Sequence, residues 1–113
     1  MTELATTGIW MVNPTKEVEF IEAWTAFAAW ASAMPGAGPL RLGRDTGNPL
    51  RFVSFGAWES TEAVRAWKSQ PEFRARIAQV LQFVDDFHPT ELDIIAVCTN
   101  GTSTSARAMR AAL

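Results

Sequence analysis

The aromatic side chains are the residues of this sequence best suited to bind a flat molecule. Its 113 residues include five Trp and seven Phe but no Tyr. So much ring surface serves a large core, a pocket for a planar ligand or a partner surface. Trp58 and Trp67 stand on either side of the start of a short predicted helix. Ser54 is a small residue in a strand of large ones, which suits either close packing or the floor of a pocket.

Few side chains could move a proton. Histidine is the residue type that titrates near neutral pH, so His88 is the default general base. It lies in Phe87-His88-Pro89, at the predicted end of a helix, where a histidine can instead serve the helix C-terminus. Arg51 either pairs across a hairpin or holds a carboxylate or phenolate at a pocket mouth. We therefore take His88 with Trp58 and Ser54 as candidate catalytic residues.

Composition excludes several classes of protein. With one His and one Cys, the sequence offers no multi-histidine or cysteine-rich metal site and no internal disulfide. A net charge of −2 gives no electrostatic footprint for nucleic acid. No apolar run is long enough to span a bilayer, and the first eight residues lack the features of a signal peptide. We expect a cytoplasmic protein with no metal, nucleic-acid or membrane partner.

Hydrophobic periodicity predicts two long helices with apolar faces. In each helix five apolar residues share one face at spacings of four and three. In the first they are Phe20, Trp24, Phe27, Ala31 and Met34, and in the second Phe73, Ile77, Val80, Val84 and Phe87. The pattern favours burial of these faces in the core, but rings in the gap between helices and sheet can also line a slot for a planar molecule. The candidate ligand-binding residues are Trp67, Trp24, Phe27, Phe73, Ile77 and Arg51.

Alternation and turn residues place the remaining elements. Ser60 is a plausible N-cap for the short helix. The predicted strands cover residues 8–12, 40–44, 51–58 and 92–98, and the predicted helices cover 15–34, about 63–67 and about 71–86. Residues 1–99 form one domain. Residues 100–113 form a polar tail, in which 106–113 could make a short helix.

The predicted order is βαββαβ, an α+β, ferredoxin-like arrangement with a four-stranded antiparallel sheet. Right-handed crossovers place both helices on one face of that sheet. Yet the strands carry apolar residues on both faces, whereas a sheet with one face in water should alternate apolar and polar. We therefore predict that a second copy covers the other face, in a homodimer.

This pattern resembles the antibiotic biosynthesis monooxygenase family. The residues that carry the resemblance are Phe52–Ser60, Ala63, Ala66-Trp67 and Pro71–Phe73, and it covers about residues 8–98. The resemblance implies a dimeric α/β barrel built from ferredoxin-like protomers. It also implies one of two activities. One branch of the family oxidises aromatic polyketides to quinones with O2 and no cofactor, and another binds and degrades heme.

The resemblance assigns roles to individual residues. Trp58 matches the strand-end tryptophan of the quinone-forming branch, and Ser54 stands where that branch has an asparagine. Trp67 matches the tryptophan that presses on heme in the other branch. Ile77, however, occupies the place of the histidine that ligates the heme iron. The resemblance therefore favours chemistry without a cofactor over heme chemistry.

We expect a homodimeric monooxygenase that binds a small, flat, electron-rich aromatic, such as a polyketide anthrone, and promotes its attack by O2. In this hypothesis Trp58 and Trp67 hold the ring, while His88 or an arginine handles the proton or the developing phenolate. Two alternatives remain open. One is a non-catalytic dimeric binding protein of the same fold. The other is an isomerase or cyclase of the same barrel type, which would need a proton-transfer pair.

Overall fold

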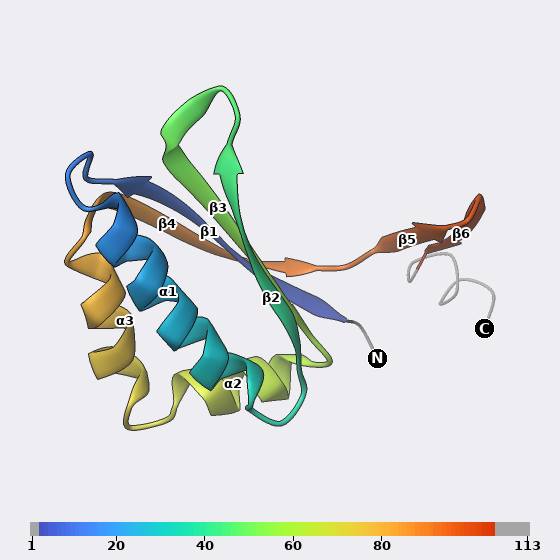
Figure 1. Cartoon of the computed structure of the whole chain (residues 1–113). Helices are drawn as coiled ribbons and strands as arrows, with labels where there is room; N and C mark the ends of the chain where they lie inside the picture. Colours follow the sequence, from blue (N-terminus) through green and yellow to red (C-terminus); the bar gives the residue numbers. More distant parts are fainter. Residues whose placement is uncertain (1–2, 106–113) are drawn as a thin grey trace.

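A computed structural model describes residues 3–105 as a sheet with three helices on one face and a projecting hairpin (Figure 1). The strands and helices follow in the order β1 (Leu4–Val12), α1 (Glu17–Ser32), β2 (Ala37–Asp45), β3 (Asn48–Trp58), α2 (Thr61–Lys68), α3 (Phe73–Leu81), β4 (Val84–Asp93), β5 (Ala96–Thr99) and β6 (Thr102–Ser105). None of the helices within residues 3–105 has the length and hydrophobicity needed to cross a bilayer.

The main sheet has the strand order β2-β3-β1-β4, and every neighbouring pair is antiparallel. This arrangement confirms the ferredoxin-like α+β fold. Helices α1, α2 and α3 lie on the same side of the sheet (Figure 1). In the central pair, Trp10 of β1 lies opposite Phe52 of β3, and Gly8 lies opposite Ser54. These residues point toward the helices, because Trp10 and Phe52 are both in the buried core.

Helix α1 forms where the apolar stripe predicts it. Phe20, Trp24, Phe27 and Ala31 are buried on its inner face. Helix α2 begins as predicted at Ser60, whose side chain accepts a hydrogen bond from the backbone N–H of Ala63 at 3.1 Å. Such a cap satisfies one of the N–H groups that the first helical turn leaves unpaired.

The predicted helix over about residues 71–86 is wrong for the residues after Leu81. Helix α3 ends at Leu81, and β4 begins at Val84. The sheet register shows why the spacing misled. Val84 lies opposite Val12, but Asp86 lies opposite Met11, so one extra residue is inserted between these two pairs. Such a bulge turns Val84 and Phe87, three residues apart, toward the same core, which imitates helical spacing.

The predicted last strand over residues 92–98 is also wrong. It joins the last two residues of β4, Leu92 and Asp93, to the first three residues of the separate strand β5. Ala96–Thr99 pairs with Thr102–Ser105 in a hairpin of its own. Its turn is Asn100-Gly101, with φ values of +53° and +80°. An Asn-Gly pair with positive φ is the preferred two-residue hairpin turn, so a sequence signal was present in the polar tail. The predicted helix at 106–113 lies outside the described residues.

The first strand begins earlier than predicted. Residues from Leu4 onward pair with β3 on one side and with β4 on the other, so β1 is a central strand of the sheet. Leu4 and Ala5 are buried. Residues 4–7 are therefore part of the sheet.

The helices leave one face of the sheet uncovered, which we call the open face. Its apolar residues alternate with those that face the helices; they are Ile9, Met11, Val53, Phe55 and Leu92. Phe55 is 44% exposed and Leu92 is 41% exposed. The sequence prediction of apolar residues on both faces is therefore correct for the central strands.

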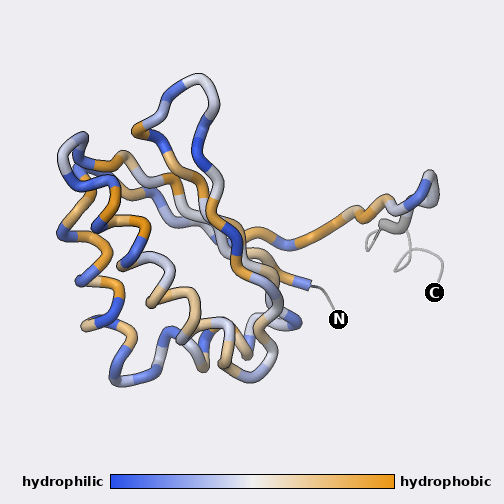
Figure 2. Tube along the Cα trace, in the orientation of Figure 1, coloured by the Kyte–Doolittle hydropathy of each residue, from blue (hydrophilic) through white to orange (hydrophobic). Residues whose placement is uncertain are grey.

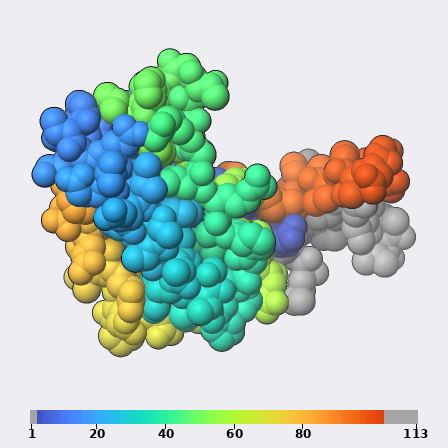
Figure 3. All heavy atoms as spheres, viewed as in Figure 1, coloured from blue at the N-terminus to red at the C-terminus, as the bar shows by residue number. Residues whose placement is uncertain are grey.

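The β5–β6 hairpin extends away from the body of the molecule (Figure 3). The segment that leads into it is hydrophobic (Figure 2), and Ile95 and Val97 in this region are 50% and 45% exposed. A two-stranded hairpin alone is marginally stable in water. Among the described residues, the exposed large apolar side chains other than Val18 of α1 lie on the open face and in the region of the projecting hairpin.

Candidate ligand-binding pocket

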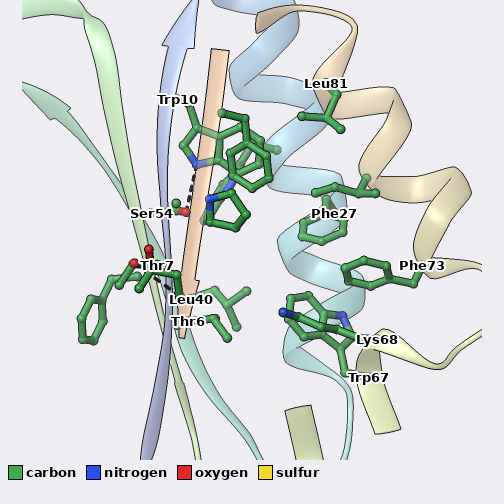
Figure 4. A pocket seen from close by; sticks show the side chains of 18 residues that line it. Thr6, Thr7, Trp10, Phe27, Leu40, Ser54, Trp67, Lys68, Phe73 and Leu81 are labelled. Atoms are coloured by element: carbon green, nitrogen blue, oxygen red, sulfur yellow. Dashed lines mark hydrogen bonds between the residues drawn. The ribbon is translucent and has the colours of Figure 1, made fainter. Parts of the chain in front are cut away.

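The described residues enclose a pocket between the sheet and the helices (Figure 4). Its volume is about 310 Å³. The lining residues are Thr6, Thr7, Gly8, Trp10, Trp24, Phe27, Leu40, Ser54, Phe55, Gly56, Trp67, Lys68, Phe73, Ile77, Leu81, Phe87, Pro89 and Thr90. The lining is almost entirely apolar, with a few hydroxyl groups on the sheet side, a composition typical of sites for small organic molecules.

Aromatic rings from the helices form one wall of the pocket. The Trp67 ring lies 5.0 Å from the Phe73 ring, edge to face, and 5.8 Å from the Phe27 ring. Phe27 and Phe73 are in turn 6.0 Å apart. Rings at these separations attract one another and form a rigid wall against which a flat molecule can pack.

Trp58 supports this wall from outside the pocket. Its ring stacks on the Trp67 ring, with centroids 4.7 Å apart and planes 24° apart. Only 1% of Trp58 is exposed, and it is not among the lining residues. The structure therefore brings the two tryptophans together, as expected, but gives access to Trp67 alone.

The sheet forms the floor of the pocket. Trp10 donates a hydrogen bond from Nε1 to Ser54 Oγ at 2.9 Å, and Trp58 donates from Nε1 to Thr6 Oγ1 at 3.1 Å. Phe87 stacks on Trp10 with ring centroids 3.9 Å apart. Ser54 thus lies at the floor, which is one of the two alternatives that the sequence left open for it.

Lys68 is the one charged side chain in the lining. Its Nζ lies 2.9 Å from Glu91 Oε2 on β4, and both side chains are well exposed, so this ion pair marks the rim of the pocket. An exposed pair of this kind contributes little to stability. Lys68 is therefore free to exchange its partner for an anionic group on a ligand.

Two candidate residues lie elsewhere. His88 is on the open face, opposite Ile9, and its side chain is 67% exposed with Nε2 2.7 Å from Asp86 Oδ2. It lies within β4, so it does not cap a helix. Arg51 pairs with Asp45 at 3.0 Å near the β2–β3 turn. The Gly47 N–H first, and then the Arg51 guanidinium, lower the pKa of Asp45 below its ordinary value.

Of the nine candidate residues, six line the pocket: Ser54, Trp67, Trp24, Phe27, Phe73 and Ile77. Sequence reasoning missed Trp10 and Phe87, which stack at one end of the floor. It also missed Thr6 and Lys68. Trp10 could have been found from the alternation of the first strand. Phe87 was hidden by the bulge, which placed it on a helix.

The lining lacks the side chains that a heme group requires. Heme iron is held by an axial His, Cys, Met or Tyr. None of these residue types occurs in the lining of this pocket. Among the described residues there is also no cluster of three or more His, Cys, Asp or Glu that could hold a metal ion. The residues of this pocket do not fit a heme site.

The fold and the pocket together define an α+β protein with a ferredoxin-like sheet and an aromatic cavity beneath its helices. The family model described as antibiotic biosynthesis monooxygenase matches residues 7–79. That match covers well over half of the chain, and the protein belongs to this family. The match includes β1 from residue 7 onward, all of α1, β2, β3 and α2, and most of α3, which supply most of the pocket.

Solved structures share the fold at low sequence identity. SnoaB from Streptomyces nogalater, described as a cofactor-independent oxygenase, is 19% identical with a TM-score of 0.76, covering 88% of this chain and 98% of that one. Rv0793 from Mycobacterium tuberculosis is 19% identical with a TM-score of 0.70, covering 80% and 92%. A conserved protein from Methanosarcina mazei Go1 is 13% identical with a TM-score of 0.75, covering 81% and 92%. No curated protein matches the chain.

Proposed function

We propose that this protein is a cofactor-independent monooxygenase that oxidises a planar, electron-rich aromatic substrate of the polyketide type with O2. The observation that supports this proposal is the pocket of about 310 Å³ between sheet and helices, which is lined largely by aromatic rings. This volume is at the lower end for small-molecule sites, which suits a ligand of two or three fused rings. Membership of the monooxygenase family and the likeness to SnoaB agree with it.

In the proposed reaction the substrate itself supplies the electrons. Loss of a proton from an anthrone-like CH2 group gives an enolate, which transfers one electron to O2. The two resulting radicals combine to form a carbon–oxygen bond, and the peroxide takes up a proton. Loss of water then converts the carbon into a carbonyl. One oxygen atom ends in the quinone and the other in water, so no external reductant is needed.

The chain contributes binding, exclusion of water and charge. Trp67, Phe27 and Phe73 hold the aromatic skeleton, and the apolar lining keeps water from the reacting carbon. Lys68 stands at the rim, where a cation favours the enolate over the neutral substrate. Trp58 acts behind Trp67 as a positioning residue. His88 and Arg51 lie outside the pocket and receive no direct role within a protomer.

The test is aerobic incubation with anthrone, with quinone formation and O2 uptake measured together. We expect one O2 consumed per quinone and no product without O2. Trp67→Ala should slow turnover about two- to tenfold, because it removes one aromatic contact of the kind worth about 0.5–1.5 kcal/mol. Val18→Ala is the control, because Val18 is 65% exposed on α1 and does not line the pocket. Quinone formation no faster than in buffer refutes the proposal.

One observation favours a second candidate, a binding protein without turnover. Within the described lining there is no carboxylate or imidazole that could accept a proton. The same observation disfavours an isomerase or cyclase, which needs a proton-transfer pair. Saturable quenching of tryptophan fluorescence by a planar aromatic, with no O2 uptake, would identify the binding protein.

We also propose that two copies pair through their open faces. Phe55 on the central strand β3 and Leu92 on the edge strand β4 are large apolar residues that are 44% and 41% exposed, and exposed apolar surface of this kind marks an interface. Sheet-on-sheet packing of two protomers buries it from both sides. A second copy is the occupant because it brings an identical apolar surface, which closes with two-fold symmetry.

Sedimentation equilibrium tests the dimer. The wild type should sediment as a dimer at micromolar concentration, and Phe55→Asp should sediment as a monomer, because it buries two unpaired charges in the interface. Val18→Asp is the matched control. It places the same charge on a more exposed valine of α1, away from the open face, and should remain dimeric. A monomeric wild type contradicts the proposal.

A further inference from the structure

Two indole–hydroxyl pairs span the strands β1 and β3 at the pocket floor. Trp10 on β1 donates to Ser54 on β3 at 2.9 Å, and Trp58 on β3 donates to Thr6 on β1 at 3.1 Å. The two hydrogen bonds run in opposite directions across the same strand pair. Both hydroxyl residues line the pocket, and Figure 4 shows Ser54 and Thr6 on the sheet side, facing the helix residues.

Glycines make room for both pairs. Gly8 lies opposite Ser54, and Gly56 lies opposite Thr6. A Cβ atom added to Gly8 would lie 2.9 Å from both Ser54 Oγ and Trp10 Nε1. A Cβ added to Gly56 would lie 3.0 Å from Thr6 Oγ1. The floor therefore consists of two hydroxyl groups and two positions where any larger residue would crowd them.

The indoles determine what these hydroxyl groups can do. An indole N–H is only a donor, so Ser54 and Thr6 must use an oxygen lone pair to accept from it. Each hydroxyl keeps its own hydrogen to donate. Within residues 3–105, neither hydroxyl donates to a protein acceptor. A donor left unpaired beside an apolar cavity costs free energy, which an acceptor atom on a ligand offsets.

The indoles are themselves held in place. Trp10 is 2% exposed and stacks on Phe87 at 3.9 Å, and Trp58 is 1% exposed and stacks on Trp67 at 4.7 Å. Rings packed in this way have one orientation, so each N–H fixes the direction from which its hydroxyl accepts. Each hydroxyl group can therefore donate its own hydrogen only in the remaining directions, and the cavity lies in one of them. A positioned donor is more selective than a freely rotating one.

We propose that these pairs form a donor floor, which selects planar aromatic ligands carrying a ketone or phenolate oxygen on the edge that faces β1 and β3. Ser54 and Thr6 contact the ligand oxygen, and Trp10 and Trp58 are positioning residues. The helix-side rings accept any flat hydrocarbon, so the floor supplies the discrimination. The inference rests on the proposed function for the ligand's planarity, but it concerns recognition and not turnover.

Binding of 9-fluorenone and fluorene tests this inference, because the two probes share a flat three-ring skeleton and only fluorenone carries a carbonyl. Calorimetry should show tighter binding of fluorenone. Ser54→Ala and Thr6→Val should each weaken fluorenone binding about three- to tenfold, the effect of one neutral hydrogen bond, and leave fluorene unchanged. The infrared carbonyl stretch of bound fluorenone should rise in frequency in the same variants, because a hydrogen bond lowers it.

Trp10→Phe tests the positioning role, since it keeps Ser54 and an aromatic ring but removes the N–H. It should reduce the preference for fluorenone and broaden the carbonyl band, a change that a purely structural ring would not produce. Ser32→Ala is the control, because the Ser32 hydroxyl is exposed on α1 and bonds to the Ala29 carbonyl. If Trp10→Phe does not fold, Ser54→Ala and Thr6→Val decide.

The outcomes separate this inference from the proposed function. Equal affinity for the two probes, or an unchanged preference in both hydroxyl variants, overturns the donor floor alone. Failure of the wild type to bind either probe overturns both the floor and the proposed ligand class. Selective binding of fluorenone without oxidation of anthrone supports the floor and overturns the monooxygenase.

Discussion

Replacing Trp58 with Phe should destabilise the protein more than replacing Trp67 with Phe. The two indoles are buried to 1% and 5% exposure and stack on each other at 4.7 Å, so they share one environment. They differ in one respect. Trp58 Nε1 donates to Thr6, whereas Trp67 Nε1 is buried with no hydrogen-bond partner among the described residues.

The magnitudes follow from this difference. Each substitution removes two carbon atoms and one nitrogen from the core, and at about 0.8 kcal/mol per buried carbon the shared cost is roughly 1.5 kcal/mol. Trp58→Phe also loses a hydrogen bond worth about 1 kcal/mol, giving a total of about 2–3 kcal/mol. Trp67→Phe removes a donor that has no acceptor, which offsets part of its cost, so about 1 kcal/mol or less remains.

Urea unfolding followed by far-UV circular dichroism measures both values, since the tryptophan signal itself changes. With a slope of about 1–3 kcal/mol per M for a small protein, the midpoints of the two variants should differ by about 0.5–1 M. Protein concentration must be equal throughout, because association shifts apparent stability. A double-mutant cycle with Thr6→Val should return a coupling of about 1 kcal/mol with Trp58.

Two results would refute the reasoning. Equal costs for the two Phe variants would mean that the hydrogen bond to Thr6 contributes nothing. A larger loss of stability for Trp67→Phe would mean that the Trp67 N–H donates a hydrogen bond, contrary to the premise of the comparison. A coupling near zero in the cycle would lead to the first conclusion independently.

Three further predictions test other parts of the structure. Gly8→Ala should lower stability by about 1–3 kcal/mol, because the added Cβ would crowd Trp10. A thermal melt measures this loss, with Gly43→Ala as the control, because the atom nearest to a Cβ at Gly43 is 3.8 Å away. Ser60→Ala should cost about 1 kcal/mol in urea unfolding through loss of the α2 cap. The lowered pKa of Asp45 means that its contribution is present above its unfolded pKa of about 3.9 and is lost as pH falls further, so melts of Asp45→Asn and wild type should converge at low pH.

Local chemistry was sufficient for much of the fold. The cap at Ser60 and the apolar stripe of α1 each depend on neighbours in the chain, and the structure confirms both. The family resemblance was also correct, because its residues lie in one continuous stretch. Six of the nine candidate residues line the pocket, because the core faces of the amphipathic helices and strands meet in the space between them.

The failures came from features that exist only between strands. The bulge opposite Met11 and Val12 turned two residues of a strand toward the core at a helical spacing, and only pairing with β1 distinguishes the two cases. The same error placed His88 at a helix end, whereas the register of β4 puts it on the open face. A residue's face in a strand depends on register, which one inserted residue reverses.

The sequence by itself determined that the chain builds a ferredoxin-like α+β layer with rings on its inner surfaces, because periodicity and turn chemistry are local properties. Tertiary structure alone decided which of those rings line a cavity, which side chains reach it and which hydroxyl meets which indole. Contacts such as Trp10 with Ser54 join residues far apart in the chain, and they are set by strand register to within one residue. No spacing along the sequence encodes that register.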